Sequence, residues 1–247
     1  MNLKVFASFI FILSLLMSCE KLPGVDGTIT ESNLNYKTVG ASANELLSAD
    51  KPSLVVEIHY MKGYALQSAT LNNIVSFVQT YMNKPGGVQI WQKEIPASTN
   101  PTLTTTDLAN IEKEHRTAYS TSKQVAVYIL VTNGRFTDAN TIGCAYLNTS
   151  LSLFGKTIQQ FSTGYSLTFK SKLETSTAQH EFGHLLGLVN MGTPMQVNHA
   201  DVEHKGHCTN PKCLMYYKAG HAEMQSYLTN GVATLDANCR NDLNSNK

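Results

Sequence analysis

The sequence lacks an excess of charge of either sign. Its 247 residues hold 19 Lys and Arg against 18 Asp and Glu, a formal net charge of +1. No basic block or stripe runs along the chain, which argues against a nucleic-acid partner. Internal repeats and long low-complexity tracts are also missing. The length and a hydrophobic content of 42% suit one sizeable globular domain, with at most a small appendage.

The longest apolar run, residues 5–17, is too short for a comfortable membrane span. It follows a short, singly charged start, so residues 1–18 are predicted to be a signal peptide. The letters LMSC that end this stretch resemble a bacterial lipobox, which implies that Cys19 becomes a lipidated first residue. Residues 19–50 would then be a tether. The mature protein is expected to be exported and anchored at the outer membrane, the cell surface or the periplasmic face. An ordinary secretory signal and an uncleaved anchor are the alternatives.

Four further cysteines remain, an even number that predicts two disulfides in an exported chain. Cys208 and Cys213 are close in sequence and are expected to pair, which leaves Cys144 for Cys239. Free thiols, or cysteines that bind a second metal ion, are the alternatives.

Hydrophobic patterning predicts strands and helices in alternation. Strands are expected at residues 53–61, 88–95, 123–133 and 143–148, and helices at 66–83, 104–120 and 172–188. This order favours an α/β (α+β) fold, a mixed sheet with helices packed on it. Residues 51–189 form its main part. Residues 190–247 show little regular pattern and are expected to form a small irregular C-terminal subdomain.

The letters HEFGH, residues 180–184, carry the chemistry. His180 and His184 are four residues apart, so both imidazoles project from one face of a helix, as two zinc ligands require. Glu181 stands where its carboxylate can take a proton from a zinc-bound water and later pass it to a leaving amine. The pattern on a predicted helix therefore indicates a zinc hydrolase.

The motif and its surroundings resemble the metzincin zinc peptidases, whose motif H-E-x-x-H-x-x-G-x-x-H precedes a Met-turn. Gly187 and Met215 match the glycine and the Met-turn, but Asn190 stands where the last ligand belongs. The resemblance implies a zincin-like mixed sheet with an active-site helix and one catalytic Zn²⁺. It also implies a peptide or protein substrate.

The third ligand must then come from elsewhere, because a neutral amide is a poor zinc ligand. The stretch HCTNPKCLM, residues 207–215, resembles the archaemetzincin pattern H-C-x4-C-x-M, which implies that His207 is the ligand. The alternatives left open are His199, His204, Asp201 and Asn190 itself. Archaemetzincins complete a second, structural zinc site with further downstream cysteines. This chain has only Cys239 there, so a second site is not expected.

Two further features follow from the resemblance. Tyr217 lies two residues after Met215, where some metzincins have a tyrosine that binds zinc or the transition-state oxyanion. Its alternative role is packing beneath the site. The edge strand at residues 143–146 is expected to pair with an extended substrate.

The sequence therefore predicts a lipid-anchored zinc metalloendopeptidase that uses Glu181, Tyr217 and one zinc ion. A non-catalytic zinc-binding surface lipoprotein with a metzincin-like fold is the main alternative. A surface adhesion domain that kept the fold is a third.

Overall fold

The computed structural model describes residues 37–220, 228 and 231–246. The predicted signal peptide and Cys19 lie outside these residues. The strands are β1 (Ser53–Met61), β2 (Gly87–Ile95), β3 (Thr102–Leu103), β4 (Gln124–Val131), β5 (Arg135–Phe136), β6 (Gly143–Leu147) and β7 (Ser150–Leu153). The helices are α1 (Ala43–Leu47), α2 (Ser68–Tyr81), α3 (Thr105–His115), α4 (Gly155–Phe161), α5 (Leu167–Leu185), the short 3-10 helix η2 (Tyr217–Gly220) and α6 (Ala237–Asn244).

Five strands form one mixed sheet in the order β2-β1-β4-β7-β6. The first four are parallel, and β6 runs antiparallel to β7 at the edge. The apolar strand β4 lies at the centre, as the sequence predicted, and is buried along almost its whole length. The predicted α/β class with a mixed sheet is confirmed.

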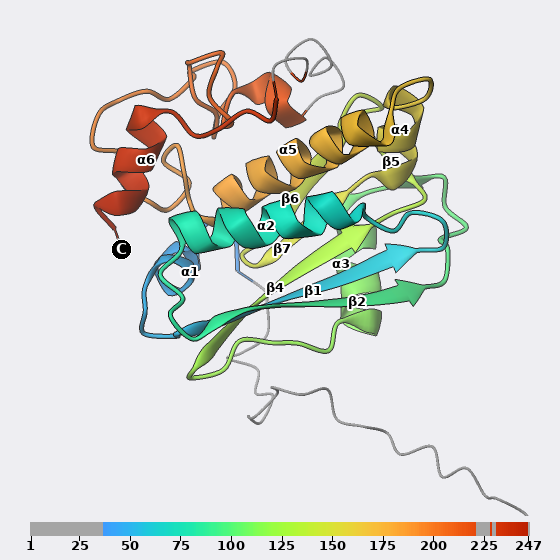
Figure 1. Cartoon of the computed structure of the whole chain (residues 1–247), viewed down its shortest axis with the longest axis horizontal. Coiled ribbons are helices and arrows are strands. Elements are labelled where there is room, and N and C mark those ends of the chain that lie inside the picture. The colour runs from blue at the N-terminus through green and yellow to red at the C-terminus, as the bar shows by residue number, and fades with distance from the viewer. Residues whose placement is uncertain (1–36, 221–227, 229–230, 247) are drawn as a thin grey trace, which may run out of the picture.

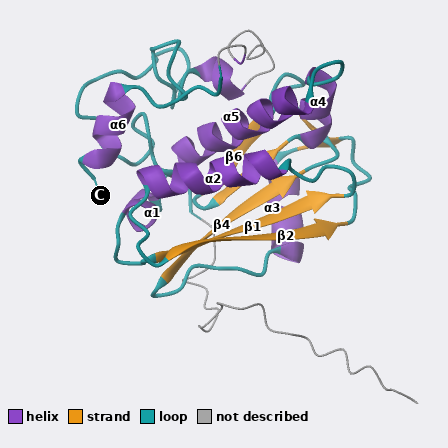
Figure 2. Ribbon diagram, viewed as in Figure 1, coloured by secondary structure: helices purple, strands orange, loops and turns teal. Residues whose placement is uncertain are grey.

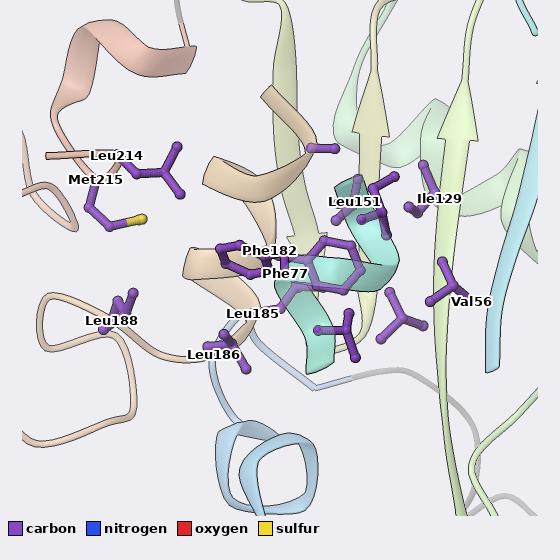
Figure 3. Packing of buried hydrophobic residues seen from close by; sticks show 14 of the residues in the cluster. Val56, Phe77, Ile129, Leu151, Phe182, Leu185, Leu186, Leu188, Leu214 and Met215 are labelled. Carbon is purple, nitrogen blue, oxygen red and sulfur yellow. The ribbon is translucent and has the colours of Figure 1, made fainter. Parts of the chain in front are cut away.

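Helices cover both faces of this sheet (Figures 1 and 2). Helices α2 and α5 lie together on one face, and α3 lies on the other. The larger core lies between the sheet and the α2–α5 pair. Figure 3 shows Phe182 of α5 lying between Met215 and the strand residues Val56 and Ile129. The segment after α5 passes over the side of that helix that faces away from the sheet.

Helix α5 carries the HEFGH motif and has clear ends. Its N-cap is Ser166, whose hydroxyl accepts a hydrogen bond from the Phe169 amide. It ends at Leu185, and Gly187 follows with a φ of +70°, as expected for a helix-ending glycine. A Cβ on Gly187 would collide with the Thr193 amide, so the chain needs glycine at this turn. The helix starts five residues before the predicted residue 172.

Helix α3 is fixed to the opposite face by buried charges. Arg116, at its end, donates to the Glu112 carboxylate at 2.6 Å and to the Ala126 carbonyl of β4 at 2.9 Å. Glu57 of β1 accepts hydrogen bonds from the Thr117 and Ala118 amides at 3.0 and 2.7 Å. The Ala126 carbonyl of β4 and the amides after α3 thus bind the charged groups of Arg116 and Glu57, as burial of charge requires.

Some elements were not anticipated. Within the segment expected as tether, residues 43–47 form α1, and Leu46 and Leu47 are fully buried. Strand β7 and helices α4 and α6 were also missed. Among the described residues, no helix has both the length and the hydrophobicity needed to cross a membrane.

Candidate metal centre

Three imidazoles meet where α5 faces the C-terminal segment. His180 and His184 come from α5, and His207 comes from the loop before the Met-turn. One ring nitrogen from each lies within 4.8 Å of the others. The Nε2 atoms of His180 and His184 are 3.1 Å apart. Two ligands on one tetrahedral zinc ion are separated by about 3.3 Å when each bond is about 2.0–2.1 Å long.

In two of these rings, His180 and His207, the contact of Nδ1 shows which ring nitrogen carries the proton. His180 Nδ1 lies 2.7 Å from the Leu214 carbonyl oxygen, and His207 Nδ1 lies 3.2 Å from that of His204. A carbonyl only accepts, so each Nδ1 carries the proton and each Nε2 keeps a free lone pair. Burial also lowers the pKa of His184 and His207, which favours the neutral form that binds metal. This donor set fits Zn²⁺.

Glu181 lies beside the imidazoles, fully buried in α5. Burial raises the pKa of its carboxyl group to about 8, although a hydrogen bond from the Ala145 amide, at 2.8 Å, works in the opposite direction. A pKa close to neutrality suits a group that must both accept and release a proton. Gly143 lets β6 lie close to α5, because a Cβ there would collide with Thr177 Cγ2 at 2.5 Å and lie 3.0 Å from Glu181 Oε1.

Met215 packs against α5 between the two helical histidines. A Cβ on Gly183 would collide with its Sδ, so the glycine of HEFGH allows this close approach. The Met215 carbonyl accepts a hydrogen bond from the Cys208 amide at 2.8 Å. The methionine therefore supports both the helix and the loop that brings His207.

A cleft of about 400 Å³ opens over these residues. The three imidazoles, Glu181, residues 143–145 of β6, Met191, Lys205 and Tyr217 line it. Strand β6 pairs with β7 on one side only within the described sheet. The cleft thus combines three imidazoles that could hold a metal ion, a buried carboxylate, a phenol and a sheet edge.

The other candidates for third ligand lie elsewhere. Asn190 is exposed in a turn with a φ of +63°. His199 is buried between Asp242 of α6, at 2.8 Å, and the Cys208 sulfur, at 3.4 Å. His204 is bound by Asp201 at 2.9 Å and stacks on Tyr217. The structure thus groups His207, and none of these four, with the two helical histidines.

The predicted disulfides are wrong: Cys144, Cys208, Cys213 and Cys239 are all free thiols. Cys144 lies in β6 and lines the cleft, and it forms no disulfide with Cys239. Closeness in sequence does not decide whether two sulfurs face each other. The turn at residues 208–213 directs the Cys213 sulfur toward Cys239 of α6, at 3.6 Å, whereas a disulfide bond is about 2.05 Å long.

Cys208, Cys213, Cys239 and Asp236 form a second group of donors within 4.8 Å of one another. Amides of Met215 and Asp236 donate to the Cys213 sulfur, each at 3.4 Å. Hydrogen bonds from the neighbouring thiols lower the pKa of Cys213, which favours its thiolate. The sequence left cysteines that bind a second metal ion open as an alternative, but it could not identify this group. Asp236 and Cys239 lie far along the chain from Cys208 and Cys213, and only the fold brings them together.

Residues 68–189 match the family described as Metallo-peptidase family M12B Reprolysin-like. No curated protein matches the sequence.

Two solved structures match most of this chain. Archaemetzincin from Methanopyrus kandleri is 12% identical with a TM-score of 0.54, over 79% of this chain and 96% of that chain. A zinc-dependent peptidase from Methanocorpusculum labreanum is 12% identical with a TM-score of 0.47, over 76% of this chain and 99% of that one. The first match shows that this chain has the archaemetzincin-like fold.

Proposed function

We infer that this chain is a metzincin-type zinc metallopeptidase that hydrolyses peptide bonds at the cleft of α5. Its reprolysin-like family match and its fold support this inference. The observation that carries this proposal is the convergence of three imidazoles beside one buried carboxylate. A structural metal site needs no general base, whereas a hydrolytic one does.

The side chains have separate roles in this proposal. His180, His184 and His207 hold the ion. Bound Zn²⁺ supplies Lewis acidity, which polarises a carbonyl and makes water more acidic. Glu181 takes a proton from the attacking water, and the protonated carboxyl then delivers it to the leaving amine. Tyr217, on the cleft wall, donates its phenol proton in a hydrogen bond to the carbonyl oxygen as negative charge develops.

The sheet edge supports an endopeptidase. Strand β6 lines the cleft and is the last strand of the sheet, so an extended peptide can add to it through backbone hydrogen bonds. Binding of this kind depends on the backbone of the substrate and needs neither of its termini. We therefore propose cleavage within peptides rather than at their ends.

Glu181→Gln tests the proposal, with the exposed Glu203→Gln as its matched control. The first variant is expected to keep the metal and to lower kcat/KM by about 10²–10⁴-fold on a mixed peptide library, since a positioned base contributes that much. The second is expected to match the wild type. Equal hydrolysis by both variants would contradict the role of Glu181. A metal-bound wild type that cleaves no peptide would favour a zinc-binding lipoprotein instead.

We also propose that Cys208, Cys213, Cys239 and Asp236 hold a second, structural ion. Three thiols and a carboxylate are suitable zinc donors, and backbone amides already point at one of the sulfurs. Two ions per chain are expected by elemental analysis of the wild type. Cys239→Ser is expected to hold one, and Cys144→Ser to hold two. One ion in the wild type, lost on replacement of His184, would contradict this second site.

Attachment to a membrane through Cys19 stays a prediction of the sequence. Incorporation of a labelled fatty acid by the full chain, and its loss in Cys19→Ser, would test it. A wild-type chain released without label would contradict it.

A further inference from the structure

The loop between Gly187 and His207 does more than carry the third ligand. It lays the imidazole of His204 flat on the ring of Tyr217, with centroids 3.6 Å apart and planes at 4°. Both rings line the cleft. The loop thus contacts the segment after Met215 through His204, which is not one of the three imidazoles grouped around the candidate metal site.

Asp201 holds the His204 ring in this position. Its Oδ2 lies 2.9 Å from His204 Nδ1, which must be the protonated nitrogen because a carboxylate only accepts. Its Oδ1 accepts from the backbone amides of Glu203 and His204, at 2.9 and 3.1 Å. Its own amide donates to the His207 carbonyl at 2.8 Å. One carboxylate therefore ties the His204 ring to the backbone that brings His207.

Tyr217 needs such a support. It opens the short helix η2, and its side chain is only half-buried. The ring also touches Tyr216, with centroids 4.7 Å apart, and the Lys218 ammonium lies 5.7 Å from its centroid. Both neighbours belong to the same segment as Tyr217. Among these ring contacts, His204 is the one that comes from a different part of the chain.

We propose that His204, oriented by Asp201, is a positioning residue that holds the Tyr217 phenol over the cleft for peptide hydrolysis. The proposal rests on the proposed function. A phenol that stabilises developing charge must already be in place when the charge appears, because reorientation during the reaction would cost part of the gain. A stacked ring supplies this restraint without touching the substrate. The loop after Gly187 then delivers two groups to the cleft, the ligand His207 and the support His204.

A double-mutant cycle tests this role. Tyr217→Phe is expected to lower kcat by about 10²-fold, the loss typical of one oxyanion donor. His204→Ala is expected to lower kcat about 2–13-fold with little change in KM, the factor that corresponds to the interaction energy of an aromatic pair. In the Tyr217→Phe background, His204→Ala should have no further effect. The same loss of kcat in both backgrounds would overturn the proposal.

Two variants separate positioning from general loop damage. His204→Phe keeps the stacked ring and is expected to recover most of the kcat that His204→Ala loses. Val202→Ala changes a neighbouring side chain that is 89% exposed and should leave kcat at the wild-type value. Metal content should be equal in all of these proteins. Loss of metal from His204→Ala, or failure of His204→Phe to recover activity, would overturn the proposal.

The near-ultraviolet spectrum tests the stack without any substrate. Removal of a ring that lies on a phenol changes the absorption and circular dichroism of that tyrosine. His204→Ala should therefore give a difference spectrum against the wild type that disappears in the Tyr217→Phe background. A difference spectrum that persists there would overturn the stack even if the protein is an active peptidase. A wild type without hydrolysis would instead contradict the proposed function and leave the spectral result interpretable.

Discussion

Residues 53–153 and residues 190–246 are ordered by different contacts. The first region builds a regular sheet whose central strand, β4, is buried on both faces by apolar side chains. Within its described residues, 190–220, 228 and 231–246, the second has few regular elements. Turns, imidazoles and thiols connect its parts, and Leu214, Met215 and Leu235 add to the shared core. Hydrophobic burial orders the first region with or without a metal ion. The second region is expected to need bound metal for its order. Without an ion, the lone pairs of its imidazoles and thiols would face and repel one another.

Metal removal should produce the largest difference between the two regions. With a chelator at neutral pH, the amides of Cys208 and Leu214 are expected to lose protection from hydrogen exchange by several orders of magnitude. Structural zinc sites contribute about 10–16 kcal/mol of apparent binding free energy. The amides of Tyr128 and Ile129 in β4 should stay protected. Equal loss of protection in both regions would contradict the different origins of their order.

Glu57→Gln tests how a buried charge contributes to the stability of the sheet region. Burial alone would raise the pKa of Glu57, but hydrogen bonds from His59, Thr117 and Ala118 outweigh it and lower this pKa. Loss of this buried charge should cost about 3 kcal/mol of unfolding free energy at neutral pH and leave the metal content unchanged.

The pH dependence of the Glu57→Gln effect has a definite sign. A carboxyl group whose pKa is lowered by folding stabilises the protein above its unfolded pKa of about 4.3, and that stabilisation is lost as the pH falls through the folded value. The difference between variant and wild type in denaturant unfolding should therefore shrink in acid. A difference that grows in acid would contradict the assigned contacts.

Asn190→Gly should have the smallest effect of these changes on stability and on metal content. Asn190 has a φ of +63°, a conformation that glycine adopts freely, and its side chain is exposed. The variant is expected to change the unfolding free energy by less than about 1 kcal/mol and to keep its metal. Loss of metal from this variant would indicate that Asn190 is a metal ligand.

The same division decides what could be predicted from the sequence. The longer strands and helices of residues 53–188 follow from hydrophobic periodicity, and the apolar run of β4 marks it as the central strand. Strand β7 was missed because its four residues, SLSL, are too few to distinguish from a turn. Helix α6, with the sequence ANCRNDLN, has weak helix formers and depends on its Asp236 cap and on the buried Cys239.

The site could be predicted in part for a similar reason. His180, Glu181 and His184 follow from helical spacing, which is local. The choice among His199, His204 and His207 is not local, because it depends on which carbonyl and carboxylate each ring meets. Only the resemblance to the archaemetzincin pattern favoured His207. The thiol group combines Cys208 and Cys213 with residues 23 to 31 positions further on, a contact that cysteine counting cannot reveal.

The metal content of His207→Ala tests the central claim most directly, with His115→Ala as a control outside the cleft. After dialysis, elemental analysis should find one ion fewer per chain in His207→Ala than in the wild type, and peptide hydrolysis should fall to background. His115→Ala should keep the wild-type content. Full metal content with retained hydrolysis in His207→Ala would contradict the account, since another side chain would then close the site.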